Sequence, residues 1–130
     1  MTDDLGRSKI LSELVETIPC KNEYDHTLKY IDKWTSLTCM PTPMALSPAA
    51  SYIEWEPLGL TLIMSSWNYP LMGILQPLAQ AIAAGNSAIM KPSELSPETA
   101  KIIQEIFDEI GDPRYVVIQG DHLTAIELTK

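Results

Sequence analysis

The sequence predicts an α/β fold in which a partial parallel sheet of the β-α-β-α-β kind follows two helices and an extended strand arm. Three observations predict it. After residue 57, short apolar runs alternate with amphipathic stretches of helical periodicity. Prolines and glycines stand where those helices would begin and end. No charged residue occurs over residues 57–90, as expected of elements buried in a parallel sheet.

The first 50 residues are predicted to form a helical segment and an extended connector. A first helix is indicated by an apolar stripe of Ile10, Leu11, Leu14, Val15 and Ile18, opposite a polar side of Lys9, Ser12, Glu13 and Glu16. Pro19 is expected to end or kink that helix. Apolar residues predict a second helix over residues 24–34. Residues 35–50 are rich in proline, which favours an extended connector.

Residues 51–130 are predicted to form the α/β domain. The expected strands cover residues 51–56, 60–64, 87–90 and 115–118. A helix opened by Pro70 should bury Leu71, Ile74, Leu75, Leu78 and Ile82 and should be kinked or divided at Pro77. The next helix, capped by Ser96, should bury Ile102, Ile103, Ile106, Phe107 and Ile110. A last helix begins over residues 123–129.

Composition excludes several classes of function. The net charge is −8, which disfavours nucleic acid and anionic membrane surfaces as partners. The uncharged stretch is not read as a membrane span, because it is interrupted by Asn68, Pro70, Gly73, Gln76, Pro77, Gln80, Gly85 and Asn86. Cys20 and Cys39 are too few for a disulfide scaffold or a zinc site, and the two histidines have no ligand spacing. A reducing, cytoplasmic location and the absence of a metal and of a secretory signal are expected.

Polar residues follow the predicted strands, and the carboxyl ends of parallel strands share one edge. Asn68 lies at a strand-to-helix turn, where its NH2 can stabilise a developing oxyanion; it can equally be only a helix cap. Lys91 and Glu94 can together bind the hydroxyls of a ribose; alternatively, they are a solvated lysine and the start of a helix. The dinucleotide-binding pattern G-x-G-x-x-G is absent from the first turn.

Five short motifs stand in order: Glu-Pro-Leu-Gly at 56–59, Ser-Trp-Asn-Tyr-Pro at 66–70, Gln-Pro at 76–77, Ala-Ala-Gly-Asn at 83–86 and Lys-Pro-Ser-Glu at 91–94. As a set they resemble the aldehyde dehydrogenase family, most closely its class-3-type branch. The resemblance covers nearly the whole chain. It implies that the chain is an N-terminal-side fragment of the family's cofactor-binding domain, with residues 51–130 as an incomplete, Rossmann-like dinucleotide-binding unit.

The resemblance also implies a role for each matching residue. Asn68 corresponds to the side-chain amide of the oxyanion hole, and Tyr69 is similar to a residue of the aldehyde pocket. Lys91 and Glu94 correspond to contacts with the adenosine ribose of NAD or NADP. The remaining cofactor-binding residues implied are Met64, Ser65, Ser66 and Trp67 along the cofactor's path and Gly120 near the adenine. The strand over residues 51–56 looks like part of an arm used in dimer assembly.

The family's reaction also needs a cysteine thiolate, which lies in a Gly-Gln-x-Cys segment, and a glutamate base further downstream. This chain contains neither that segment nor the downstream region that carries the base. Neither Cys20 nor Cys39 is expected to substitute, since nothing in the sequence places His26 or His122 near either thiol. Two interpretations remain open. The chain is either a part of an enzyme that is inactive alone, or a non-catalytic remnant that acts in assembly or binds nucleotide weakly.

Overall fold

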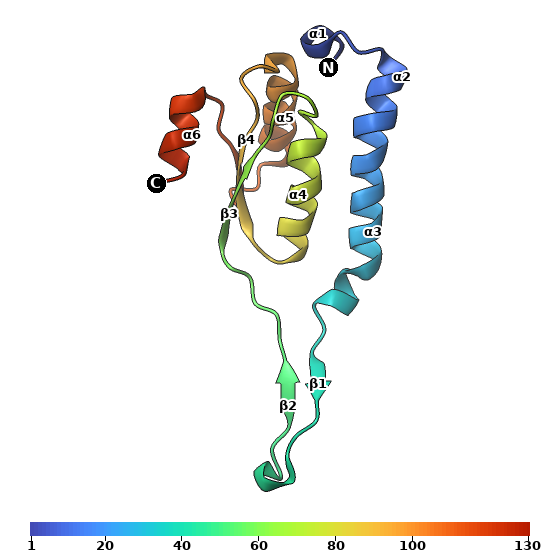
Figure 1. Cartoon of the computed structure of the whole chain (residues 1–130), viewed down its shortest axis with the longest axis vertical. Coiled ribbons are helices and arrows are strands. Elements are labelled where there is room, and N and C mark those ends of the chain that lie inside the picture. The colour runs from blue at the N-terminus through green and yellow to red at the C-terminus, as the bar shows by residue number, and fades with distance from the viewer.

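The computed structural model describes residues 1–130 (Figure 1). Its elements, in chain order, are α1 (Thr2–Leu5), α2 (Lys9–Ser12), the π-helical turn η1 (Glu13–Thr17), α3 (Ile18–Trp34), β1 (Thr38–Met40), the 3₁₀ turn η2 (Met44–Leu46), β2 (Ser51–Ile53), β3 (Leu60–Met64), α4 (Met72–Ala83), β4 (Ser87–Lys91), α5 (Pro97–Ile110), β5 (Tyr115–Val117) and α6 (His122–Leu128).

The predicted parallel sheet is confirmed. Its strand order is β3-β4-β5, and Leu62, Ile89 and Val116 lie side by side across it. Helices α4 and α5 lie on one side of the sheet and α6 on the other (Figure 1). Between the sheet and α4 and α5 is a core formed by Ile63, Ile74, Leu78, Ala81, Ala88, Met90, Ile103, Phe107 and Val117. The uncharged stretch is therefore β3, α4 and β4, as the sequence predicts.

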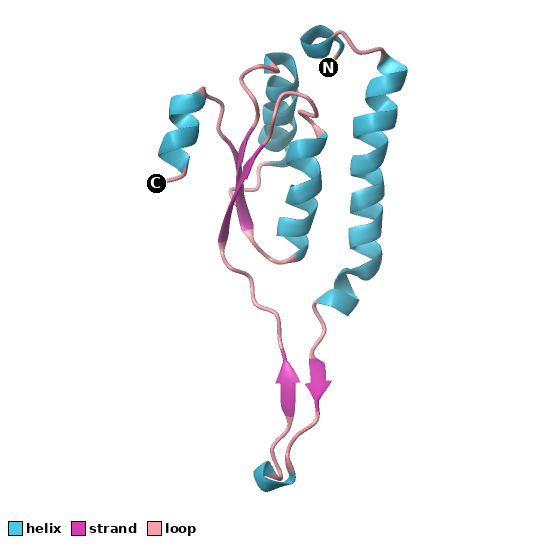
Figure 2. Ribbon diagram, in the orientation of Figure 1, coloured by secondary structure: helices cyan, strands magenta, loops and turns pink.

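The helix does not end at Pro19, so one of the two expected outcomes is wrong. Residues 9–34 form one long helical rod, with η1 as a wider turn inside it (Figure 2). Pro19 lies in the first turn of α3, directly after η1. A π-helical turn interrupts the regular N–H to C=O ladder, so the missing N–H of a proline at this point does not end the helix.

The rod also buries a different face from the predicted one, although Val15 of the predicted stripe is half-buried. Ile10, Leu11, Leu14 and Ile18 are exposed, whereas Ser12, Glu16, Cys20 and Thr27 are buried. The rod packs along α4, and its N-terminal part lies beside the turns that carry the candidate site (Figure 1). Polar partners there hold Glu16, so the buried stripe is not the apolar one.

Helix α4 runs unbroken through Pro77, so the expected division at that residue is wrong. Complete burial of Ile74 and Leu78 on the sheet side stabilises the helix and offsets the cost of about 3 kcal/mol that an internal proline imposes. Three isoleucines of α5 expected in the core, Ile102, Ile106 and Ile110, are exposed instead, as is Ile82 of α4. Only one narrow stripe of each helix therefore reaches the sheet.

The predicted connector contains a strand. β1 and β2 form an antiparallel pair that extends away from the sheet and its helices, with Cys39 opposite Tyr52 (Figure 1). The predicted strand over residues 51–56 is thus confirmed only over Ser51–Ile53.

No helix has both the length and the hydropathy that crossing a membrane requires.

Candidate functional site

The turns that follow β3, β4 and β5 open at one edge of the sheet, as the parallel order requires (Figure 1). Two of these turns are joined by hydrogen bonds. The N–H of Ser65 donates to the carbonyl of Lys91 at 3.1 Å. The hydroxyl of Ser96 donates to the carbonyl of Trp67 at 3.1 Å. The turn that carries Asn68 and the turn that carries Glu94 therefore form one connected surface.

The side chain of Ser65 forms hydrogen bonds with the backbone of the turn that carries Asn68. Its hydroxyl lies 3.1 Å from the carbonyl of Ser66 and 3.4 Å from that of Pro70. Gly73 leaves the room for this hydroxyl, since a Cβ there would meet Ser65 Oγ at 2.4 Å. The Ser65 side chain is therefore directed into the turn, whereas those of Met64 and Trp67 are exposed.

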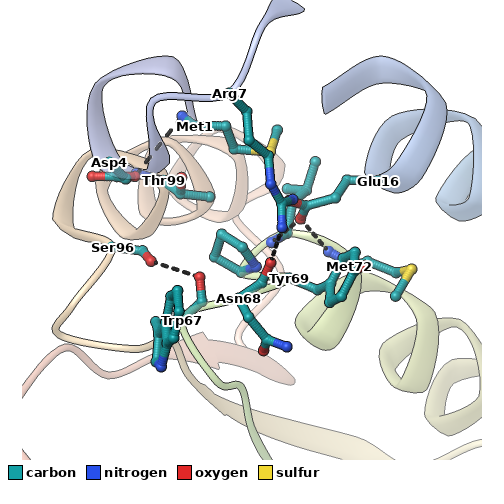
Figure 3. Close-up of polar contacts among 12 residues, drawn as sticks. Met1, Asp4, Arg7, Glu16, Trp67, Asn68, Tyr69, Met72, Ser96 and Thr99 are labelled. Atoms are coloured by element: carbon teal, nitrogen blue, oxygen red, sulfur yellow. Dashed lines mark hydrogen bonds and ion pairs between the residues drawn. The ribbon is translucent and has the colours of Figure 1, made fainter. Parts of the chain in front are cut away.

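Asn68 presents its amide to the outside. Ser66 Oγ donates to Asn68 Oδ1 at 2.5 Å, which fixes the orientation of the carboxamide. The NH2 of the same carboxamide makes no hydrogen bond within the protein. The side chain is exposed and points away from Arg7 (Figure 3). It therefore offers two N–H donors to an external oxygen.

The backbone of the same turn is held by residues from the N-terminal rod and the loop before it (Figure 3). Arg7 donates to the carbonyl of Asn68 through Nη2 and to Glu16 Oε1 through Nη1, the latter at 2.8 Å. Glu16 Oε2 accepts from the N–H groups of Leu71 and Met72 at 2.8 and 3.2 Å. The guanidinium of Arg7 also lies 4.9 Å from the ring centroid of Tyr69.

Lys91 and Glu94 form an ion pair at the end of β4, with Nζ 3.0 Å from Oε2. The lysine side chain is only 5% exposed, whereas that of the glutamate is 43% exposed. The backbone N–H of Glu94 and the ammonium of Lys91 lower the pKa of the Glu94 carboxyl below its usual value. Glu94 therefore stands as an ionised acceptor at the surface, backed by a largely buried donor.

A hollow of about 200 Å³ lies beside this pair, between the turns after β4 and β5. Its lining comprises Pro92, Ser93, Glu94, Pro97, Ala100, Gln119 and Gly120. Whole-ligand pockets are usually larger than about 300 Å³, so this one suits a part of a dinucleotide, such as a nucleoside. The ionised carboxylate of Glu94 in its lining, with the Lys91 ammonium behind it, fits ribose hydroxyls, which both donate and accept hydrogen bonds.

The structure gives a steric reason for a glycine at position 120. A Cβ at this position would meet the side chain of Thr124 at 2.2 Å, so a glycine lets the chain turn closely against α6. Asp121 follows it and caps α6 by accepting from the N–H groups of Leu123 and Thr124 at 2.9 and 3.3 Å. These contacts lower the pKa of the Asp121 carboxyl.

The expected cap of α5 is wrong. The side chain of Ser96 does not cap the helix; its hydroxyl donates to Trp67 instead. The helix is capped by Asp4, which accepts from the N–H groups of Glu98 and Thr99 at 3.0 and 2.8 Å. A carboxylate suits this end of a helix, where N–H groups are unpaired and the helix dipole is positive.

The structure thus brings Asn68 and the Lys91–Glu94 pair to one edge, and Gly120 beside Glu94. Sequence reasoning missed Asp4, Arg7 and Glu16, the three charged residues that hold the two turns. A signal for Glu16 was present: Ser12, Glu16 and Cys20 recur every four residues, which is the spacing of one helix face.

Neither cysteine lies in this site. Cys20 is buried in α3, where burial and the charge of Glu16 raise the pKa of its thiol to about 11. Cys39 is exposed on β1, in the strand pair remote from the sheet (Figure 1). No group of three His, Cys, Asp or Glu side chains has the geometry to hold a metal ion.

Comparison with known proteins relates the chain to one family. The profile described as "Aldehyde dehydrogenase family" matches residues 4–128. The chain is 39% identical over 128 residues to aldehyde dehydrogenase family 3 member A2 of Macaca fascicularis, covering 98% of this chain and 26% of that protein. The predicted class-3-type resemblance is thereby confirmed. The chain spans about a quarter of the length of the relatives it matches.

Comparison with solved structures relates the chain to the same family. A substrate-bound Staphylococcus aureus AldH superimposes with a TM-score of 0.93 at 37% identity, over 98% of this chain and 28% of that one. A Mycobacterium tuberculosis aldehyde dehydrogenase complexed with NAD+ superimposes with a TM-score of 0.81 at 26% identity, over 97% of this chain and 26% of that one. The Rossmann-like fold, the profile match and these likenesses together show that the chain belongs to the aldehyde dehydrogenase family.

Proposed function

We propose that this chain supplies the oxyanion amide and the adenosine-ribose contacts of an NAD(P)-dependent aldehyde dehydrogenase, which oxidises an aldehyde to a carboxylate. The observation that supports the proposal is the shared edge: the unpartnered NH2 of Asn68 and the Lys91–Glu94 pair lie at the same edge of the sheet. The complex of the related M. tuberculosis enzyme with NAD+ supports a nicotinamide nucleotide as the cofactor.

Asn68 stabilises negative charge on the aldehyde oxygen. When a thiolate attacks the carbonyl carbon, the carbonyl oxygen becomes an oxyanion, and the NH2 of Asn68 donates to it. Ser66 holds Oδ1, so the amide does not have to reorient as the charge develops. The nicotinamide ring supplies the hydride acceptor when the cofactor is bound. Tyr69, next in the chain, is placed to border the aldehyde.

Glu94 favours NAD over NADP in this proposal. Its ionised carboxylate accepts from a ribose hydroxyl but repels a 2′-phosphate. The pKa of Glu94 is lowered, so this repulsion persists at neutral pH. Asp121 also lies near Glu94, and its charge opposes ionisation of that carboxyl. It adds a second negative charge against a phosphorylated ribose. Met64, Ser65, Ser66 and Trp67 are proposed to border the path of the cofactor away from this subsite.

The cofactor contacts are tested by titrating the protein with NAD+ and NADP+ and following the amide signals of Ser93, Glu94 and Gly120 by NMR. Saturable shifts with NAD+, weakened in Glu94→Ala, are expected, and NADP+ should shift the same signals at higher concentration. Ile102→Ala, on an exposed face of α5 outside the hollow, is the control variant. Identical titrations of the parent protein and Glu94→Ala would count against the ribose contact.

The reacting thiolate is not proposed to come from either cysteine of this chain. Burial in α3 keeps Cys20 as a thiol, and Cys39 lies on the remote strand pair. The 130-residue chain alone is therefore expected to form no NADH from aldehydes. Absorbance measurements with short aliphatic and aromatic aldehydes check this; turnover that survives Cys39→Ser and is lost in Asn68→Ala would require a different mechanism.

Assembly with a second copy through the β1–β2 pair is the second candidate function. The pair extends away from the sheet (Figure 1), and it exposes Met40, Tyr52 and Ile53, while Trp55 is exposed just after β2. Exposed strand edges with large apolar side chains favour pairing with another chain. Light scattering over a range of concentrations tests this. Ile53→Lys should lower the apparent mass if the pair joins two copies, whereas a monomer at every concentration would contradict the proposal.

The two free cysteines support a reducing compartment, and we propose the cytoplasm as the setting.

A further inference from the structure

Two charged residues that are distant in the sequence, Arg7 and Glu16, form hydrogen bonds with the turn that carries Asn68. Glu16 is completely buried, and its carboxylate binds two backbone N–H groups at the start of α4, those of Leu71 and Met72. Leu71 N–H has no other partner among the hydrogen bonds of the protein. Glu16 therefore links the first turn of α4 directly to the N-terminal rod.

Arg7 binds the other end of the same turn, at Asn68. One nitrogen of its guanidinium pairs with Glu16 and the other donates to the carbonyl of Asn68. The planar fork of an arginine can make both contacts at once, and hydrogen bonds to charged groups are stronger than neutral ones. Its guanidinium also lies over the ring of Tyr69, which adds an attraction to that ring.

The geometry points to Arg7 and Glu16 as positioning residues for the oxyanion amide. The inference rests on the proposed role of Asn68. Arg7 binds the carbonyl of Asn68 and Glu16 binds the N–H groups of Leu71 and Met72, so the backbone that follows the Cα of Asn68 is held at two points. Ser66 then sets only the side-chain rotation. The amide is preorganised, which is the condition under which an oxyanion donor is effective.

Helix capping alone does not explain the pair. Asp4 caps α5 in the same way, with one carboxylate on two backbone N–H groups, and its cationic partner is the N-terminal ammonium, 3.8 Å from Oδ2, and not an arginine. The Arg7–Glu16 pair adds a contact with the residue whose side chain is proposed to meet the substrate. The two caps therefore provide a matched comparison within one chain.

The test uses the protein without nucleotide or aldehyde, by NMR. Two quantities are measured: hydrogen exchange at the N–H groups of Leu71 and Met72, and the signal pair of the Asn68 side-chain NH2. In Arg7→Met, exchange is expected to rise about tenfold, since the charge-assisted contacts are weakened. The Asn68 signals should move toward those of a free asparagine.

Arg7→Lys separates positioning from general stability. A lysine can pair with Glu16 but is a single point donor, so it should recover the protection of Leu71 and Met72 without restoring the Asn68 signals. Asp4→Asn is the control: it should raise exchange at Glu98 and Thr99 and leave Asn68 unchanged. If Arg7→Met does not fold, Glu16→Gln carries the test, because glutamine keeps an acceptor and loses the charge.

Asn68 signals that are unchanged in Arg7→Met or Glu16→Gln, or altered equally by Asp4→Asn, would overturn the inference. The outcome is independent of cofactor binding. A failed NAD+ titration would count against the proposed function while the turn contacts stood, and unchanged Asn68 signals with normal titration would count only against this inference.

Discussion

Asp4 and Thr99 are 95 residues apart in the chain, yet the Asp4 carboxylate accepts from both the backbone N–H and the hydroxyl of Thr99, at 2.8 and 2.6 Å. The side chain of Asp4 is 1% exposed. Helix α5, which follows the Lys91–Glu94 turn, is therefore attached to the first residues of the chain. Glu16 attaches α4 in the same manner, so the N-terminal segment holds the helices after both turns of the site.

Asp4→Ala should lower the free energy of unfolding by about 1–3 kcal/mol, because it removes a charged acceptor from three donors. Burial raises the pKa of Asp4, but hydrogen bonds from Thr99 and Glu98 lower it more, so it lies below its usual value. The stabilisation is therefore present above the unfolded pKa of about 3.9 and is lost as pH falls through the lower folded pKa. Urea unfolding at several pH values measures it.

The control for that experiment is Asp3→Ala, a neighbouring acidic residue that is exposed and for which the structure gives no side-chain hydrogen bond. Its unfolding free energy should match that of the parent protein. A difference between the parent protein and Asp4→Ala that does not shrink in acid would contradict the role given to the Asp4 charge.

Local patterns were sufficient to predict the strands and helices after residue 57. Each strand there is a short apolar run, and a helix such as α5 has a proline at its start and a left-handed glycine, Gly111, at its end. Such signals depend on neighbours in the chain. The shared edge followed from the parallel order, so the meeting of Asn68 with the Lys91–Glu94 pair could also be predicted.

Contacts between distant residues explain what could not be predicted. Ser96 has the residue type and position of a cap, but Asp4 takes that role because the first turn of the chain lies against α5. Periodicity placed Glu16 on the solvent side of its helix, since it cannot show that Arg7 and two backbone N–H groups are there to pair with it. The first 35 residues were therefore described correctly as helical and incorrectly as to which side is buried.

Two adjacent isoleucines of α5 should respond differently to truncation. Ile103 is 0% exposed and Ile102 is 49% exposed. Ile103→Ala should lower the free energy of unfolding by about 2–5 kcal/mol, through lost burial and the cavity left behind. Ile102→Ala should change it by less than about 0.5 kcal/mol. Urea denaturation of both variants compares them directly, and equal losses would show that the narrow buried stripe of α5 is wrongly placed.

The two thiols should differ in reactivity at neutral pH. Cys20 is buried with a pKa raised to about 11, so it is present as the unreactive thiol, whereas Cys39 is exposed on β1. Iodoacetamide should label Cys39 in the folded protein and both cysteines in urea. Mass spectrometry of peptides identifies the labelled site. Rapid labelling of Cys20 without denaturant would mean that α3 does not pack against α4 as described.

Lys91→Met should raise the pKa of Glu94. The backbone N–H of Glu94 and the ammonium of Lys91 lower it, and the variant removes the second of these while keeping an unbranched side chain in the largely buried position. Carbon-detected NMR titration follows the Glu94 carboxyl. Asp112 provides an internal control, since Arg114 holds its pKa at about 2 and lies outside the site. An unchanged Glu94 pKa beside an unchanged Asp112 pKa would mean that the ammonium does not stabilise the ionised carboxylate, and the pair could not then act together on a ribose.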